Sequence, residues 1–486
     1  MADKTPYRIS ASSFYNLSKC HRRVYMDLYG NPSEKGKHSD FLQLLWERGV
    51  QIEGEILNKI KAEHTIAAIE GRADQSTFEQ TLSLMKGRAD WIYQGVLIHE
   101  DKIGRPDLLE RVDGKSAFGD YYYIPCDIKS GRATKSRESE DIKSHYASQM
   151  LFYCDLLQMI QNVRPEIAKI IDIDGAVTEF DIAEYQQEFL DNKELIERIV
   201  LGKLEPEPVI GSVCTQCVWT QPCLRWAQAR QDPTLLYRVG KLRDELKKRG
   251  VHNIEDLSKI DIEDFLTPAK KIKGAARTTV EGWKRRASVW LQKAPIIYKP
   301  PAIRKTHLEV YYDIEDDPSI DHVYLHGFIE VRSGKRCDYQ CFLAGDRADE
   351  KKAANQLWTY LQSLPDDAVV YHYGSYEKTK LAVLMEKHNL SPEIMEKFDR
   401  LRCNLYGVLE QCSDWPVTSY GIKSVAKFLG FKWTAEDASG ANSIAWYTDY
   451  RKDPENRRDL MEKILTYNKE DCEAMIVVKD FLIKNG

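Results

Sequence analysis

The sequence contains no run of apolar residues long enough to cross a membrane, since a spanning helix needs about 20 in succession. It has no low-complexity tract and no repeat of fixed period, which excludes collagen-like chains and solenoid arrays. The first residues, Met1-Ala-Asp-Lys-Thr-Pro6, lack the apolar segment of a secretory signal peptide. We therefore expect a globular, cytoplasmic protein with no membrane association.

The sequence has little excess of charge of either sign. Its 486 residues include 70 Lys and Arg against 75 Asp and Glu, a formal net charge of -5. This balance excludes a uniformly basic protein that coats nucleic acid, but not one that gathers carboxylates around divalent cations and keeps its basic residues elsewhere. No G-x4-GK[ST] phosphate-binding loop occurs, so any ATP-driven step would have to come from a partner.

Changes in sequence pattern divide the chain into three predicted domains. Residues 1–230 combine amphipathic helical patterns with a β-rich stretch and end in a cysteine group, and residues 231–298 have the pattern of helices joined by short turns, as in 235–242. A Lys-Pro-Pro linker at 299–301 precedes a region of strands and helices, 305–486. About 150 residues per domain gives the same number. We predict a multidomain α/β protein with a small helical middle.

The eleven cysteines are an odd number scattered along the chain, which does not suit a disulfide framework. Three of them, Cys214, Cys217 and Cys223, form a C-x2-C-x5-C pattern. A zinc site or an iron–sulfur cluster usually takes four protein ligands, and Cys20 is the obvious remote donor. The alternative is a partial zinc knuckle, with Cys20 as a buried apolar residue. The other seven cysteines are expected to be free thiols.

The first group of candidate catalytic residues lies between residues 104 and 153. Asp127 and Lys129 are two positions apart on a predicted strand, so their side chains share one face. If Asp107 lies on the neighbouring strand, two carboxylates and an ammonium converge, as Mg²⁺-dependent phosphodiester hydrolysis requires. Gln149 and Tyr153 have helical i, i+4 spacing and would contact the substrate from one helix face.

With the order and spacing of these motifs, residues 8–230 resemble the RecB-like PD-(D/E)XK nucleases. The resemblance is closest to the iron–sulfur branch, which includes AddB-type and CRISPR-associated RecB-like nucleases. It implies a restriction-endonuclease-like core in which Asp107 and Asp127 bind the metal ion, Lys129 is the catalytic lysine, and Gln149 with Tyr153 forms the Q-x3-Y helix.

The same resemblance implies a cofactor and one departure. In that branch a 4Fe–4S cluster clamps the two ends of the nuclease domain and does no redox chemistry, with zinc as the alternative metal here. Its ligands would be Cys20, Cys214, Cys217 and Cys223. Where many relatives carry a histidine as a further metal ligand, this sequence offers Glu53. A carboxylate still binds Mg²⁺ or Mn²⁺, so activity would survive the change.

A second group of candidate catalytic residues follows the linker. Asp313 and Glu315 end an apolar strand as D-x-E and share a face, while Tyr467 and Asp471 form Y-x3-D on a predicted helix. Between them, a strand through Val369 leads into a helix that bears Glu377. Carboxylates from a strand and two helices, with a tyrosine to orient water, are the parts of a two-metal phosphodiesterase.

This order makes residues 305–486 similar to the DnaQ-like DEDD exonucleases of the RNase H-like fold, in their tyrosine-bearing subtype. The resemblance implies three metal-binding motifs: Asp313 with Glu315, then Glu377, then Tyr467 with Asp471. Relatives usually have aspartate where Glu377 stands, and the extra methylene would shift the second metal ion. The turn before the third motif places Lys423 as a possible phosphate contact.

The middle region, 231–298, resembles a helix-hairpin-helix module, and its basic stretch 270–286 would contact phosphates, a solvated helical spacer being the alternative. The sequence as a whole predicts a Mg²⁺- or Mn²⁺-dependent nuclease that acts on single-stranded or frayed DNA, with a RecB-like centre and a 3′–5′ exonuclease centre. A helicase partner would supply unwinding. The alternatives are one active centre beside a binding platform, or a non-catalytic nucleic-acid adaptor.

Overall fold

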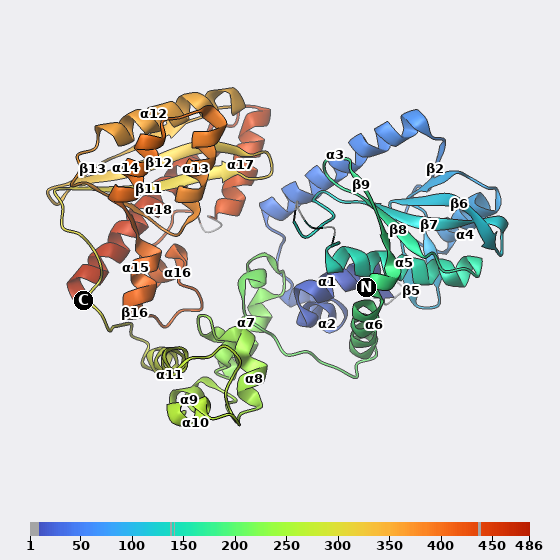
Figure 1. Ribbon diagram of the computed structural model, residues 1–486, viewed down its shortest axis with the longest axis horizontal. Helices are drawn as coiled ribbons and strands as arrows, with labels where there is room; N and C mark the ends of the chain where they lie inside the picture. Colours follow the sequence, from blue (N-terminus) through green and yellow to red (C-terminus); the bar gives the residue numbers. More distant parts are fainter. Residues whose placement is uncertain (1–8, 137–138, 140, 436–438) are drawn as a thin grey trace. The chain divides into compact units, whose positions relative to one another are not determined.

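The computed structural model describes residues 9–136, 139, 141–435 and 439–486, and the chain divides into two units (Figure 1). The first runs to residue 223 except for residues 39–41, and the second takes residues 39–41 and 224–486. Each unit contains a mixed sheet covered by helices, which confirms the predicted α/β class. No helix in the described ranges has the length and apolar character needed to cross a bilayer.

The sheet of the first unit has the strand order β2-β3-β6-β7-β8-β9, in which β6 and β7 form an antiparallel hairpin and β7 runs parallel to β8. A smaller sheet has the order β1-β5-β4. The strands are β1 (Ile9–Ser10), β2 (Ile66–Ala68), β3 (Trp91–Tyr93), β4 (Leu97–His99), β5 (Lys102–Gly104), β6 (Leu108–Ser116), β7 (Gly119–Ile128), β8 (Ile167–Ile171) and β9 (Val177–Asp181). The helices are α1 (Ala11–Lys19), α2 (His21–Tyr29), α3 (Asp40–Glu63), α4 (Gln75–Lys86), α5 (Ser144–Gln161), α6 (Gln186–Val200) and α7 (Thr220–Ala229).

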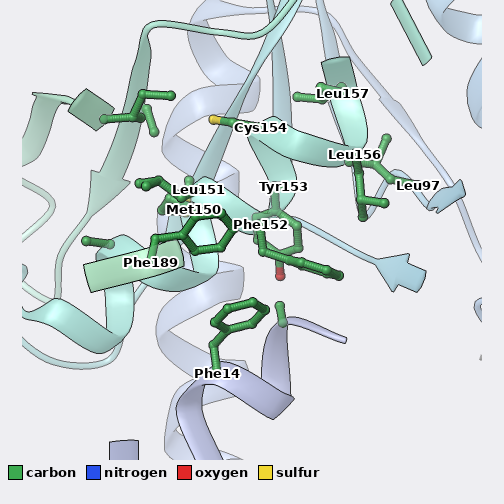
Figure 2. Packing of buried hydrophobic residues seen from close by; sticks show 14 of the residues in the cluster. Phe14, Leu97, Met150, Leu151, Phe152, Tyr153, Cys154, Leu156, Leu157 and Phe189 are labelled. Atoms are coloured by element: carbon green, nitrogen blue, oxygen red, sulfur yellow. The ribbon is translucent and has the colours of Figure 1, made fainter. Parts of the chain in front are cut away.

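Helix α5 is the centre of the first core. Its residues 150–154 are all buried, and Asn162, in the left-handed conformation with φ of 58°, ends the helix. Figure 2 shows Phe14 of α1 packed against α5, where its ring centroid lies 5.3 Å from that of Phe152 and 5.2 Å from that of Phe189 on α6. Because side chains on β7 alternate between faces, Tyr123 packs in this α5 core while Cys126 packs in a separate cluster with Ile56 of α3.

The sheet of the second unit has the order β13-β12-β11-β14-β15, with β11 antiparallel to β12 and parallel to β14. The strands of this unit are β10 (Ile296–Ile297), β11 (Leu308–Asp317), β12 (His322–Arg332), β13 (Lys335–Leu343), β14 (Val369–His372), β15 (Arg402–Asn404) and β16 (Ser413–Asp414). Tyr312 and Ile314 of β11 pack on one side in a cluster with Trp358 of α12, whereas Tyr311 packs on the other side with Met475 of α18. Asp313 and Glu315 therefore face α18.

The helices of the second unit follow the sheet and the helical segment before it. They are α8 (Arg243–Lys247), α9 (Ile254–Ser258), α10 (Ile262–Leu266), α11 (Arg277–Gln292), α12 (Glu350–Ser363), α13 (Tyr376–His388), α14 (Pro392–Leu401), α15 (Leu405–Cys412), α16 (Ile422–Phe428), α17 (Gly440–Lys452) and α18 (Arg458–Asn485). The helix expected over 235–242 is wrong. That stretch holds only short 3-10 turns, Pro233–Leu235 and Gly240–Leu242, because Arg238 between them has a φ of 58°.

The helical segment is fastened to the rest of the second unit through Asp414. This carboxylate is 1% exposed and accepts hydrogen bonds from Arg285 and Arg286 of α11, the latter at 3.0 Å. Other cations of the basic stretch also have internal partners, among them Lys284, which donates to the Ile260 carbonyl at 2.9 Å, and Arg277, which pairs with Glu263. For the basic residues that make these internal contacts, the contacts favour a structural helical spacer over a surface that binds phosphates.

Candidate active sites

The β6–β7 hairpin brings Asp107 and Asp127 together. Asp107 directly precedes β6, whose first residue, Leu108, pairs with Cys126. The Asp107 backbone N–H donates to Asp127 Oδ1 at 3.0 Å, and the Ile128 N–H donates to Asp107 Oδ2 at 2.7 Å. The two carboxylates are thus held side by side, although Asp107 lies just before β6 rather than on the strand itself. Burial, followed by the charge of Asp127, raises the pKa of Asp107 well above its usual range.

Lys129 and Gln149 complete the row on this side of the sheet. Lys129 Nζ lies 2.6 Å from Asp127 Oδ2 and 3.3 Å from Gln149 Oε1. Burial opposes the charged ammonium, but Asp127 and Asp107 outweigh it and raise the pKa of Lys129, so the side chain is a cation at neutral pH. Tyr153, one turn along α5 from Gln149, is buried, and its hydroxyl donates to the Arg105 carbonyl at 3.4 Å.

Glu53 of α3 reaches the same site, through a residue that the motifs do not include. Gln94 Nε2 donates both to Glu53 Oε1, at 2.8 Å, and to Asp107 Oδ1, at 3.1 Å. The Tyr93 hydroxyl also donates to Glu53 Oε1, at 2.8 Å. Gln94 has a φ of 55°, a conformation that few non-glycine residues adopt, and this backbone aims its amide at the carboxylates. Sequence reasoning missed Gln94 because no spacing rule relates it to either acid.

The second site is a triad of carboxylates in the second unit. Among the residues that the structure describes, the only three or more Asp, Glu, His or Cys residues whose ligand atoms all lie within 4.8 Å of one another are Asp313, Glu315 and Asp471. Burial and the neighbouring Asp471 charge raise the pKa of Glu315 to about 8, and the same causes raise that of Asp313 well above its usual range. Crowded buried carboxylates of this kind are the donor set of a divalent cation such as Mg²⁺ or Mn²⁺.

Asn468, fully buried on α18, orients the Asp313 carboxylate. Its Nδ2 donates to Asp313 Oδ2 at 2.7 Å, while its Oδ1 accepts from the Tyr339 hydroxyl at 2.8 Å. The space for the amide exists because the residue opposite Asp313 on β12 is Gly327; a Cβ there would lie 1.7 Å from Asn468 Oδ1. The arrangement holds one oxygen of the Asp313 carboxylate toward α18.

Tyr467 and Asp471, predicted as Y-x3-D, lie one turn apart on α18 with a hydrogen bond between them. Trp433 Nε1 donates to Asp471 Oδ1 at 2.7 Å. Lys423 Nζ lies 4.3 Å from the centre of the Tyr467 ring, and burial lowers the pKa of this lysine. Asp471, Glu315 and Asp313 oppose that shift, which places the Lys423 ammonium beside the triad.

Glu377 lies apart from the triad. It is buried in the first turn of α13, where its Oε1 accepts from the Tyr373 N–H at 3.2 Å and its Oε2 lies 3.4 Å from His372 Nδ1. Its charge contributes to the raised pKa of Asp313, so the two groups are near each other. The structure therefore brings Glu377 to the neighbourhood of the site but not into ligand spacing with the other acids.

The four predicted cysteine ligands line one pocket of the first unit, although Cys20 and Cys214 are far apart in sequence. Lys19, Arg22 and Arg23 line it as well. Tetrahedral zinc, with Zn–S bonds of about 2.3 Å, would hold sulfurs roughly 3.8 Å apart. In the described ranges no three of these sulfurs lie within 4.8 Å of one another. The structure thus gathers the four cysteines around one pocket without bringing three of their sulfurs into close ligand spacing.

The other cysteines are unpaired, and none forms a disulfide in the described ranges, which contain all eleven. Four of the seven, Cys126, Cys154, Cys412 and Cys472, are buried. Burial raises the pKa of the Cys154 thiol, as it does for the pocket thiol of Cys223, whose pKa rises to about 12. The remaining thiols are thus core residues or half-buried side chains, as expected.

Carboxylates gather at both sites, one of them with a hydrogen-bonded lysine, and this arrangement suits a metal-dependent phosphodiester hydrolase. Residues 16–224 match the family model of the PD-(D/E)XK nuclease superfamily, and residues 310–483 match that of the RNase H superfamily. The chain therefore carries an N-terminal PD-(D/E)XK nuclease superfamily domain and a C-terminal RNase H superfamily domain. No curated protein matches it.

Proposed function

We propose that the protein is a Mg²⁺- or Mn²⁺-dependent nuclease with two working centres, which degrades single-stranded or frayed DNA. The observation that carries the proposal is the triad of Asp313, which is half-buried, with the buried Glu315 and Asp471, whose ligand atoms lie within 4.8 Å of one another. Such crowding of acids is unfavourable without a cation, and divalent cations are the usual compensation. A bound cation supplies Lewis acidity and lowers the pKa of water.

In the C-terminal centre, the triad would hold the cation and the residues around it would orient the reactants. The Tyr467 hydroxyl, bonded to Asp471, is placed to position a water molecule. The Lys423 ammonium beside the triad offsets negative charge on a phosphate. We assign this centre to 3′–5′ exonuclease action of the DEDD type.

In the N-terminal centre, Asp107 and Asp127 would hold the cation, with Glu53 as a further ligand. The Lys129 ammonium, 2.6 Å from Asp127, stabilises charge that develops during cleavage and orients the nucleophilic water. Gln149, hydrogen-bonded to Lys129, fixes the ammonium and faces the substrate. We assign this centre to the RecB-like iron–sulfur branch.

We also propose that Cys20, Cys214, Cys217 and Cys223 bind a 4Fe–4S cluster with a structural role. The support for this proposal is the pocket that the four cysteines share and the basic residues that line it. Trp219, within the cysteine group, donates through Nε1 to Asp27 of α2 at 2.8 Å, so the pocket already joins the two ends of the domain. Duplex unwinding would fall to a separate helicase, since the sequence has no phosphate-binding loop.

The test is cleavage of an end-labelled single-stranded oligonucleotide with Mg²⁺ or Mn²⁺, compared among wild type, Lys129→Ala, Asp313→Ala and the double variant. We expect each single variant to lose one product pattern and the double variant to lose at least a hundredfold in rate. Binding without any metal-dependent cleavage by the wild type would contradict the proposal and leave a nucleic-acid adaptor.

One observation favours a second candidate function, in which only the N-terminal centre cleaves. Glu377 stands outside ligand spacing with the triad, so the C-terminal domain would bind a strand without hydrolysing it. In that case Asp313→Ala cleaves as the wild type does, whereas Lys129→Ala is inactive.

A further inference from the structure

Three aromatic rings lie in a row beside the Lys129 ammonium, on helices α1 and α5. The ring centroids of Tyr15 and His145 are 5.6 Å apart at an interplanar angle of 71°, and those of His145 and Tyr146 are 4.3 Å apart at 58°, so the rings are inclined to one another. Lys129 Nζ lies 5.3 Å from the centre of the Tyr146 ring. The row, here called the aromatic ladder (Tyr15, His145 and Tyr146), therefore leads from the 37%-exposed Tyr15 to the candidate catalytic lysine.

Two further ammonium groups border the ladder. Lys19 Nζ lies 5.1 Å from the centre of the Tyr15 ring, and Lys143 Nζ lies 5.5 Å from that of Tyr146. Lys143 also donates to the Arg132 carbonyl at 2.5 Å, which fixes its position. Like charges gathered in this way repel one another, and an anionic ligand would relieve the repulsion. Aromatic faces interleaved with cations are the means by which proteins hold single-stranded nucleic acids.

The ladder is rigidly mounted. Phe14, the residue before Tyr15, is buried between α5 and α6, as Figure 2 shows, so the core sets the position of α1. His145 and Tyr146 belong to α5 itself and are half-buried. Burial, and then the charges of Lys19 and Lys143, lower the pKa of His145 to about 4, so its imidazole is neutral at physiological pH.

A purely structural role explains these contacts less well. Phe14 and Leu17 already bury the face of α1 that meets the core, so Tyr15 is not needed to attach the helix. Lys19 of α1, Lys143 at the N-cap of α5 and Lys129 after β7 all lie close to the rings, which gives the ladder a cationic border. The arrangement is accounted for if the rings receive bases and the lysines receive phosphates.

We propose that the aromatic ladder stacks the bases of a single-stranded nucleic acid and leads its backbone to the Lys129 centre. Bases within a duplex already stack on one another, so only a single strand or a frayed end presents free faces to the ladder. The inference deepens the proposed function, on which it rests for the fate of the strand. Binding to the ladder itself requires no metal ion.

The test measures binding rather than cleavage. Fluorescence anisotropy with a labelled oligothymidine of about 15 nucleotides, in EDTA, compares wild type with Tyr15→Ala and Tyr15→Phe. We expect Tyr15→Ala to weaken binding about tenfold and Tyr15→Phe, which keeps the ring, to bind as the wild type does. Tyr29→Ala is the matched control, because Tyr29 is 42% exposed in the same unit but packs on Tyr25.

A second ligand separates stacking from charge. An abasic strand of equal length keeps the phosphates, so the wild type should bind it more weakly, and Tyr15→Ala should lose nothing further. Equal losses on both strands, or unchanged affinity of a folded Tyr15→Ala protein for oligothymidine, would overturn the ladder. A wild type that binds through the ladder but cleaves nothing would refute the proposed function alone. Cleavage with no effect of Tyr15→Ala on binding would refute the ladder alone.

Discussion

At the scale of single residues, the C-terminal centre depends on an amide as much as on its acids. Asn468 has one hydrogen-bonding orientation, because the Asp313 carboxylate can only accept from its Nδ2, which leaves its Oδ1 to accept from the Tyr339 hydroxyl. Hydrogen bonds of this kind to a metal-binding carboxylate fix which oxygen faces the ion. The amide therefore controls the shape of a site that it does not enter.

We predict that Asn468→Ala weakens Mn²⁺ binding and C-terminal cleavage by about 10- to 100-fold, the usual effect of removing such a partner. Tyr339→Phe, which frees the amide to rotate, should lose less. Titration calorimetry with Mn²⁺ in an Asp127→Ala background, which removes a proposed ligand of the N-terminal centre, measures the effect on affinity at the C-terminal centre. Gly327→Ala should reproduce the loss, because its added Cβ displaces the same amide. Affinity within twofold of the parent in a folded Asn468→Ala protein would refute the role.

At the scale of elements, the sequence motifs predicted the parts of both sites that follow local periodicity. The D-x-E pair on β11 and the Y-x3-D pair on α18 are related by rules of two and of four residues. Asp107 joined Asp127 because hairpin strands pair in sequence order. These relations need no knowledge of how helices pack on the sheet.

The residues that sequence reasoning missed owe their positions to packing between distant segments. Gln94 reaches Asp107 through an unusual backbone conformation, and Trp433 reaches Asp471 from a loop 38 positions earlier in the chain. Only the isolated Gln-Gly pair at 94–95 hinted at a turn. The prediction of a helix over 235–242 was wrong for a similar reason. The apolar pattern of the stretch suits a helix, but Arg238, with a positive φ, turns the chain there.

Strand β12 carries a buried histidine that should make the second unit sensitive to acid. Burial lowers the pKa of His326 to about 3, below the ordinary value of 6.5, and its Nδ1 is 2.8 Å from the Tyr312 hydroxyl. Below pH 6.5 the His326 imidazole is therefore protonated in the unfolded chain but stays neutral in the folded protein. The contribution of the neutral, buried imidazole to the free energy of unfolding is complete above pH 6.5. It is lost as the pH falls toward 3, at up to about 1.4 kcal/mol per pH unit.

We predict that urea unfolding of the wild type shows about 2 kcal/mol more loss of stability between pH 7 and pH 5 than unfolding of His326→Gln does. His307→Gln is the control, since His307 is exposed and its replacement should leave the pH dependence unchanged. Parallel stability curves for the wild type and His326→Gln would show that His326 is protonated in the folded state.

At the scale of the whole molecule, the cysteine pocket is lined by two segments of the first unit that are nearly 200 residues apart in the sequence. A cross-link that closes so long a loop contributes on the order of 5 kcal/mol by the chain-entropy argument. The proposed cluster would therefore stabilise the first unit, while the second unit contains none of its ligands.

We predict that protein purified without oxygen is brown and that Cys217→Ser is colourless, with the thermal transition of the first unit lowered and that of the second unchanged. Calorimetry resolves the two transitions, and iron analysis accompanies it. Cys337→Ser, which alters a half-buried thiol of the second unit, should keep the colour. Zinc in place of iron in the wild type would contradict the cluster.

The contacts of the buried Asp414 determine which fragments of this protein can fold separately. Its two arginine partners belong to α11, and β10, just before the proline-rich linker, pairs with β16, the strand that contains Asp414. A fragment that starts at residue 305 would leave the Asp414 carboxylate buried without a cation, which lowers the free energy of unfolding by about 3–5 kcal/mol. We predict that expressed residues 305–486 are insoluble or melt far below residues 224–486, as soluble yield and melting temperature will show. The proline-rich linker therefore does not mark the start of a domain that is stable by itself.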